Sequence, residues 1–180
     1  MKRTYAFAAA LVLAACNPQP QHAIRTHSPK PAASGVPPLR ITGHGSVRRP
    51  VRIFERNASR KLYELVAKSY VSHSSQSTAH AIFQDADVTF YAKDGTTLRA
   101  RAPVATVDEQ KKQVVLTGGV HGVGSNGSTL SCRKLTYDRA TGLIFGEDDV
   151  RITGMQGGSQ EVLTGNRFTS DITLTQMKMQ

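Results

Sequence analysis

Two stretches of this 180-residue sequence have residue types that support chemistry in other proteins. Residues 122–127 fit the G-x-G-x-x-G pattern, which cradles a dinucleotide when a helix follows it. Residues 128–132 are instead typical of a strand, which favours a hairpin loop over a nucleotide site. Cys132 alternates with Leu130 on one strand face, and its only sequence-local candidate base is the distant His121. This pattern favours a buried structural thiol over a nucleophile.

The other reactive residue types lack the spacing that catalysis or metal binding needs. The serine-rich run 69–77 has no G-x-S-x-G or S-x-x-K pattern to activate a hydroxyl. The six histidines are dispersed without close pairs, and the acids at 147–149 lack the ligand spacing of a calcium loop. The sequence therefore predicts a protein that is not an enzyme and that has no catalytic residue, no metal site and no cofactor.

One cysteine does have a chemical context, at the amino-terminal end of the chain. Two basic residues precede an apolar run over residues 5–15, which is too short to span a bilayer of about 30 Å. The run ends in L-A-A-C, typical of a bacterial lipobox, whose small residues admit the peptidase and whose thiol accepts the lipid. We predict a lipoprotein signal peptide over residues 1–15 and lipidation at Cys16. The alternative is cleavage nearby that leaves Cys16 as a free thiol.

The basic charge is concentrated between this cysteine and the start of the strand-rich region. The formal net charge is +10, from 23 Lys and Arg against 13 Asp and Glu. Residues 16–60 have eight basic residues and one acid, whereas residues 61–180 have thirteen and twelve. We predict a basic, Pro-rich linker over residues 16–50 that either lies on an anionic membrane surface or is simply solvated. The nearly neutral remainder argues against nucleic acid as a partner.

The elements that would position these residues are short strands. The alternation at 97–102 puts Arg99 and Arg101 on one face and apolar residues on the other. Gly-containing turn signals separate the strands, and no segment has a convincing amphipathic helix pattern. The strands are expected at 61–67, 87–91, 97–103, 113–117, 129–135, 142–145, 149–153 and 171–179. An all-β sandwich or open jelly roll is predicted.

The strands also recur as a group of similar units. Each unit has an opening valine, then a leucine, and in the last three units an aspartate. These residues are Val51, Val88, Val120 and Val150; Leu62, Leu98, Leu130 and Leu163; and Asp108, Asp138 and Asp171. We interpret the pattern as four stacked repeats in one sheet assembly. The alternative is chance in a β protein rich in Val and Leu.

Several of these segments together resemble the LptC family, the periplasmic, inner-membrane-attached component of the lipopolysaccharide export bridge of Gram-negative bacteria. They are R-K-L-Y-E-L-V-A at 60–67, D-V-T-F-Y at 87–91 with Asp94-Gly95, L-T-Y-D at 135–138 with Thr141-Gly142, V-R-I-T-G at 150–154, and L-T-G at 163–165 with Phe168. The resemblance runs from about Val51 to Met179, and the predicted LptC-like domain covers residues 51–180. It implies an all-β fold, an open twisted β-jelly roll built of repeated antiparallel strand units, following the signal peptide and the Pro-rich linker.

The resemblance also implies a function and a set of site residues. Lipid A acyl chains of lipopolysaccharide would slide through an apolar groove, from the permeases of an inner-membrane ABC transporter to a soluble periplasmic bridge protein of the same fold. The groove would be lined by Tyr63, Leu65, Val88, Phe90, Leu98, Ala100, Val114, Leu116, Val120, Leu130, Val150, Ile152 and Phe168. Each of these residues also suits an ordinary core. The last strand would add to the next subunit through Ile172, Leu174, Met177 and Met179.

The resemblance leaves two points open. The family commonly anchors through a transmembrane helix, whereas this chain has the lipobox ending at Cys16. We expect a periplasmic lipoprotein of the inner membrane, although Asn17 does not separate inner from outer membrane retention. The alternative function is an envelope lipoprotein scaffold that joins β-jelly-roll partners edge to edge without binding lipid.

Overall fold

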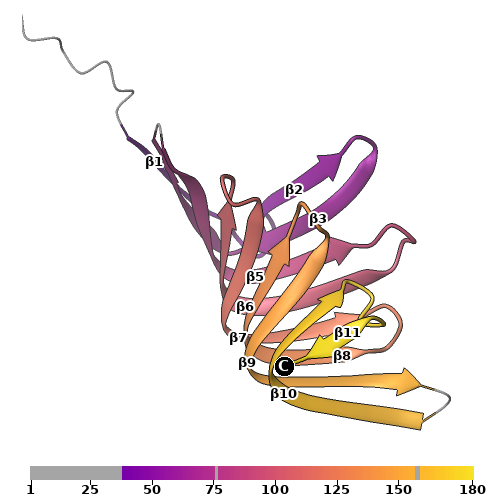
Figure 1. Ribbon diagram of the computed structural model, residues 1–180. Coiled ribbons are helices and arrows are strands. Elements are labelled where there is room, and N and C mark those ends of the chain that lie inside the picture. The colour runs from indigo at the N-terminus through magenta and orange to yellow at the C-terminus, as the bar shows by residue number, and fades with distance from the viewer. Residues whose placement is uncertain (1–37, 76, 157–158) are drawn as a thin grey trace, which may run out of the picture. The chain divides into compact units, whose positions relative to one another are not determined.

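The computed structural model describes residues 38–75, 77–156 and 159–180, which form one eleven-stranded antiparallel sheet (Figure 1). The predicted signal peptide and Cys16 lie outside the described residues. The strands are β1 (Leu39–His44), β2 (Val51–Asn57), β3 (Arg60–Ala67), β4 (Ser69–Ser74), β5 (Ala79–Tyr91), β6 (Thr97–Asp108), β7 (Gln113–Gly124), β8 (Thr129–Asp138), β9 (Leu143–Gln156), β10 (Ser159–Asp171) and β11 (Met177–Met179). Strands β4 to β11 follow one another across the sheet, with β1 beyond β4 and the β2–β3 hairpin paired to β5. The prediction of an all-β, open antiparallel jelly roll is confirmed.

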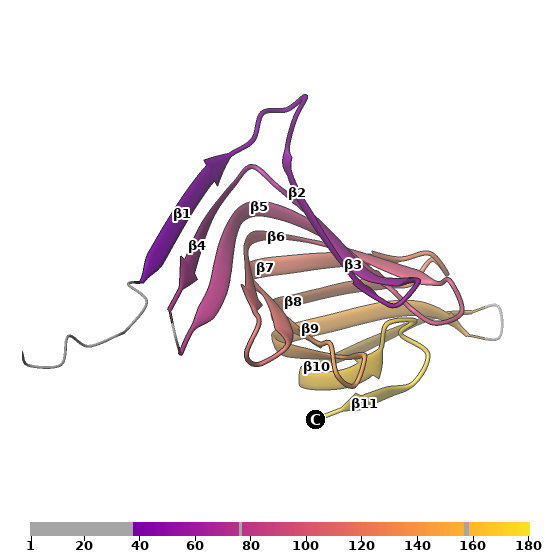
Figure 2. The ribbon, with the colours of Figure 1, turned by 90° about the horizontal axis from the view of Figure 1, so that it is seen from above.

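The long strands β5 to β10 bend near their middles, so that the sheet folds back toward itself (Figure 2). We call the two halves arm 1 and arm 2 and the line between them the crease. Arm 1 consists of β1, β4, β11 and residues 79–84, 104–108, 113–117, 134–138, 143–147 and 167–171. Arm 2 consists of β2, β3 and residues 86–91, 97–102, 120–124, 129–132, 150–156 and 159–165. Each long strand thus contributes to both layers of the jelly roll.

Backbone conformations that most residues avoid mark the crease. Asp85, Asp148 and Asp149 have φ values of 52°, 60° and 53°, and Gly118 and Gly119 have values of 92° and 98°. The ladder registers shift at the same level of β6, β7, β8, β9 and β10. Such irregularities bend strands and increase their local twist, which accounts for the fold of the sheet.

Alternating apolar residues on the inner faces of both arms form the core. In β6, Leu98, Ala100 and Ala102 are buried, whereas Arg99 and Arg101 are exposed on the outer face, as predicted. A glycine makes room for one large side chain, because a Cβ at Gly146 would overlap the Phe168 ring. The core therefore depends on close fitting as well as on the period-2 pattern.

The predictions at the two ends of the strand-rich region need correction. Strand β1 lies inside the region 16–50 predicted as linker, and the folded part of the chain begins before residue 51. Its residues are largely exposed, so it forms by pairing with β4 and has little of the apolar alternation that marks a buried face. The strand predicted at 171–179 is also wrong, since β10 ends at Asp171, a turn follows and β11 has three residues.

Candidate functional site

The interior between the arms is a continuous apolar core. Phe90 of arm 2 meets Tyr137 of arm 1 with ring centroids 4.8 Å apart, so the arms contact each other directly. All thirteen predicted groove residues are buried in this core: Tyr63, Leu65, Val88, Phe90, Leu98, Ala100, Val114, Leu116, Val120, Leu130, Val150, Ile152 and Phe168. The inner faces are therefore packed against each other, and a guest between them would have to replace side-chain contacts.

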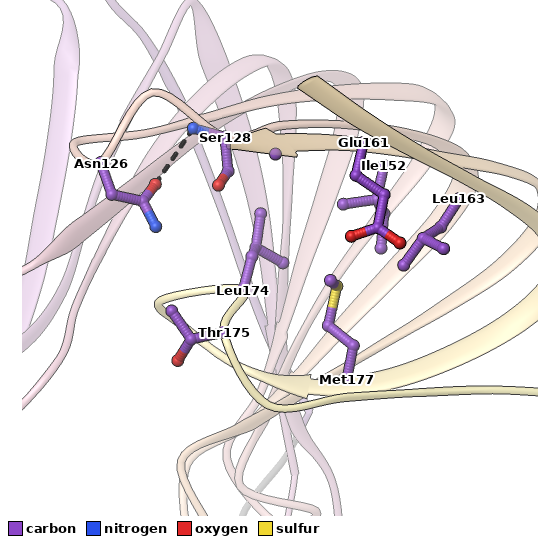
Figure 3. Close-up of a pocket in the computed structure, with 9 residues that line it drawn as sticks. Asn126, Ser128, Ile152, Glu161, Leu163, Leu174, Thr175 and Met177 are labelled. Carbon is purple, nitrogen blue, oxygen red and sulfur yellow. Dashed lines mark hydrogen bonds between the residues drawn. The ribbon is translucent and has the colours of Figure 1, made fainter. Parts of the chain in front are cut away.

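Cavities open into this interior at both ends of the sheet. At the β1–β4 end, a cavity of about 450 Å³ is lined by apolar side chains that include Ile53, Tyr70 and Phe83. At the β10–β11 end, a cavity of about 320 Å³ is lined by Ile152, Leu163, Leu174 and Met177 together with Glu161, Asn126, Ser128, Gly154 and Thr175 (Figure 3). Both cavities thus combine apolar walls with a few polar groups.

The predicted partner-edge residues divide into two environments. Ile172 and Leu174 lie in the turn after β10 and are buried, and Leu174 has a φ of 57°. The Asn126 amide donates a hydrogen bond to the Thr173 carbonyl at 2.7 Å, which ties this turn to arm 2. Met177 and Met179 are half-buried in β11, which pairs with residues 168–170 of β10. The turn therefore covers the interior, and β11 together with the uncovered part of β10 forms the sheet edge.

The three repeated aspartates cap turns of arm 1. The Asp108 and Asp138 carboxylates each accept two hydrogen bonds from backbone N–H groups in the turns that follow β6 and β8. The Asp171 carboxylate does the same after β10. Such bonds replace the missing ladder contacts at strand ends and fix the turn conformation. They position Glu109 and Arg139, which directly follow two of these aspartates.

Arg139, Glu55 and Glu109 form an ion cluster that the sequence did not predict. The Arg139 guanidinium donates hydrogen bonds to the Glu55 carboxylate on β2 and to a Glu109 oxygen at 3.1 Å. Burial raises the pKa of the neighbouring Tyr63 phenol well above its usual value, and the nearby Glu55 carboxylate raises it further. The cluster joins arm 1 to arm 2, although Glu55 and Arg139 lie 84 residues apart in sequence.

The residues considered for catalysis have structural environments. Cys132 is a buried free thiol, and burial raises its pKa to about 12, which suppresses the reactive thiolate. The glycine motif spans the end of β7 and its turn into β8, closed by a hydrogen bond from the Gly124 N–H to the Ser128 carbonyl at 2.8 Å, so the hairpin prediction is confirmed. His73 and His80 stack across β4 and β5. Within the described residues, no three metal-binding side chains cluster.

A folded antiparallel sheet with an apolar interior and capped turns defines this chain as an open β-jelly-roll protein. A family model for lipopolysaccharide-assembly, LptC-related proteins matches residues 54–180, and the chain belongs to the LptC family. Members of that family act in lipopolysaccharide transport, in the periplasm and in association with the inner membrane; it is not an enzyme family. No curated protein matches the chain. In the described part of the chain, no helix has the length and hydrophobicity to span a bilayer.

Proposed function

We propose that the interior between the arms binds the lipid A acyl chains of lipopolysaccharide and relays them from the permeases of an ABC transporter to a soluble periplasmic bridge protein of the same fold. The observation that carries this proposal is the apolar core shared by the two arms, with cavities at both ends. The transfer of each acyl CH₂ group from water into an apolar interior is favourable by about 0.8 kcal/mol of free energy. An acyl chain can therefore compensate for side-chain contacts that it displaces.

The free edges of the sheet suit the transfer between subunits. Among the described residues, strand β1 pairs with β4 on one side only, and its Leu39 and Ile41 are exposed. At the other end, β11 pairs with residues 168–170 of β10. Among the described residues, 159–165 of β10 therefore pair only with β9. Exposed edges can add a strand from a partner through main-chain hydrogen bonds. We place the transporter at the β1 edge and the next bridge protein at β10 and β11, including Met177 and Met179.

Photo-crosslinking in cells tests the binding of acyl chains. A photoreactive residue at Phe90 or Leu116, both fully buried between the arms, is expected to label lipopolysaccharide. The same residue at Arg99 or Val115, on the outer faces of the same two arms, should give little or no labelled lipid. Labelling that is stronger from the outer positions than from the buried ones would refute the proposed binding site.

The exposed edges also support a second candidate function, an envelope lipoprotein scaffold that joins jelly-roll partners without holding lipid. Native mass spectrometry of the purified chain separates the two functions. A lipid carrier should retain a mass that corresponds to lipopolysaccharide or its lipid A, whereas a scaffold should have the mass of the protein alone. Loss of the bound mass after substitution of a buried residue such as Leu116 by a charged one would link that lipid to the interior.

We further propose that Cys16 is lipidated after removal of residues 1–15 and holds the protein on the inner membrane through a basic linker. Two or more acyl chains are sufficient for stable membrane attachment. The Cys16→Ala variant is therefore expected to move from the membrane pellet to the soluble periplasmic fraction. A variant that still sediments with membranes after a high-salt wash, which removes electrostatic binding of the linker, would contradict the anchor.

A further inference from the structure

The Arg139 cluster is the one ionic connection between the arms. Among the ion pairs of the described residues, the other pairs lie within one arm or along the crease, whereas Arg139 and Glu55 join the turn after β8 to strand β2. Arg139 also donates to the Asp108 carbonyl at 3.2 Å, which holds the guanidinium on arm 1. The contact with Glu55 is thus the part of the cluster that must break if the arms separate.

The burial of Arg139 indicates a role other than stability. Its side chain is 5% exposed, and its Nε has no hydrogen-bond partner among the described residues. Removing a guanidinium from water costs so much free energy that a buried ion pair often stabilises a protein no more than apolar side chains of similar size would. A buried ion pair does, however, hold two elements in one defined arrangement. Here those elements are the two arms.

The cluster also lies between two openings of the interior. Glu109 lines the cavity of about 450 Å³ beside Ile53 and Phe83. Arg139 lines a third cavity, of about 650 Å³, in which Leu62 and Tyr137 lie beside polar residues such as Lys93 and Thr141. Because Arg139 and Glu109 are hydrogen-bonded to each other, this pair lies between the two cavities. Glu55 lies on β2 between Ile53 and Asn57, which line one cavity each, so its separation from Arg139 would join the two cavities into one longer opening between β2 and the turns of arm 1.

We propose that Arg139, Glu55 and Glu109 form a latch that closes the interior, and that acyl chains of an amphiphile enter when Glu55 leaves Arg139. Glu55 and Glu109 are 31% and 58% exposed, so water can reach both carboxylates as the latch opens. Within the part of the chain that the structure describes, strand β2 is paired only with β3, and its register shifts next to Glu55, which lets it move without breaking the rest of the sheet. This proposal rests on the proposed function, because it assumes that the interior admits lipid.

A reversible cross-link across the latch tests the proposal. The full chain with Cys16→Ser, Glu55→Cys and Arg139→Cys is treated with a bifunctional methanethiosulfonate reagent about as long as the two side chains it replaces. Uptake of lipopolysaccharide with a fluorescent acyl chain is then measured. We expect the cross-linked protein to load at least tenfold more slowly than the same protein after reduction. The reduced protein should load at least as fast as the chain with Cys16→Ser alone.

The matched control places the cross-link within one arm, between Val115→Cys and Thr136→Cys, which face each other on β7 and β8 of arm 1. That cross-link should leave loading unchanged. The Glu55→Gln variant, in which Arg139 keeps Glu109, should load faster than the unchanged chain. Equal loading of the cross-linked and reduced latch variants would overturn the latch while leaving the proposed function intact. Absence of loading in every protein, including the unchanged chain, would instead overturn the proposed function.

Discussion

The Phe90→Ala substitution is expected to lower the free energy of unfolding by about 3–5 kcal/mol. Phe90 is fully buried, and its ring bridges the two arms through Tyr137. Truncation of a buried aromatic ring loses its transfer free energy and leaves a cavity that the surrounding strands fill only in part. Urea unfolding followed by circular dichroism measures the loss.

Phe54→Ala is the matched control. Phe54 is the same residue type on β2, but it faces outward and is 59% exposed. Its truncation should change the free energy of unfolding by no more than about 0.5 kcal/mol. If Phe90→Ala cost less than about 1 kcal/mol, the inner faces would be apart in solution, and the interior would be an open groove. A large loss would instead mean that loading with lipid requires the arms to separate.

The strands of arm 2 were the most predictable part of the fold. In β6, one face is buried and the other is charged, so Leu98, Arg99 and Ala100 alternate in the sequence as they do in space. Strands β1 and β4 lack this contrast, since their residues are exposed or half-buried on both faces. Strand β1 forms through pairing with β4, which is distant in sequence, and β4 lies between β1 and its hairpin partner β5. Local patterns do not record such pairing.

The crease shows a second limit of local patterns. The expected strands end at residue 117 and break between residues 145 and 149, which places Gly118-Gly119 and the acids at 147–148 between separate strands. They are bends inside β7 and β9, and each of those strands continues into the other arm. A left-handed backbone conformation suits both a turn and a bend, so the local sequence is the same for either. The prediction therefore located the irregular residues correctly and divided the long strands wrongly.

For a similar reason, the apolar interior could be predicted from the sequence and the ion cluster could not. The family resemblance implies the thirteen apolar residues, and the period-2 pattern agrees with it where they alternate along a strand, as Leu98 and Ala100 do. Glu55, Glu109 and Arg139 occur singly in two turns and a strand, and nothing in their local sequence separates them from solvated charges. Only the closure of one arm over the other brings them together. A buried charge cluster assembled across a fold leaves no local signal.

Removal of the two carboxylates is expected to cost much more stability than removal of the arginine between them. In the Glu55→Gln, Glu109→Gln double variant, the Arg139 guanidinium stays buried without a counter-charge, which should lower the free energy of unfolding by about 3 kcal/mol or more. Arg139→Met leaves two carboxylates that water can reach, and its cost should be about 1 kcal/mol or less. Urea unfolding of the three proteins measures both losses.

The triple variant, with Arg139→Met added to the two glutamines, distinguishes this account from general damage to the fold. Because the methionine removes the uncompensated charge, the triple variant should recover about 2 kcal/mol relative to the double variant. With the cost of Arg139→Met alone included, the coupling energy is about 2–3 kcal/mol, which is typical of residues in one network. If the three substitutions were simply additive, the groups would not act as a unit, and an ionic latch would be excluded. Recovery in the triple variant would mean that the cluster contributes little net stability. Its value to the protein would then lie in holding the arms in one arrangement until the ion pair breaks.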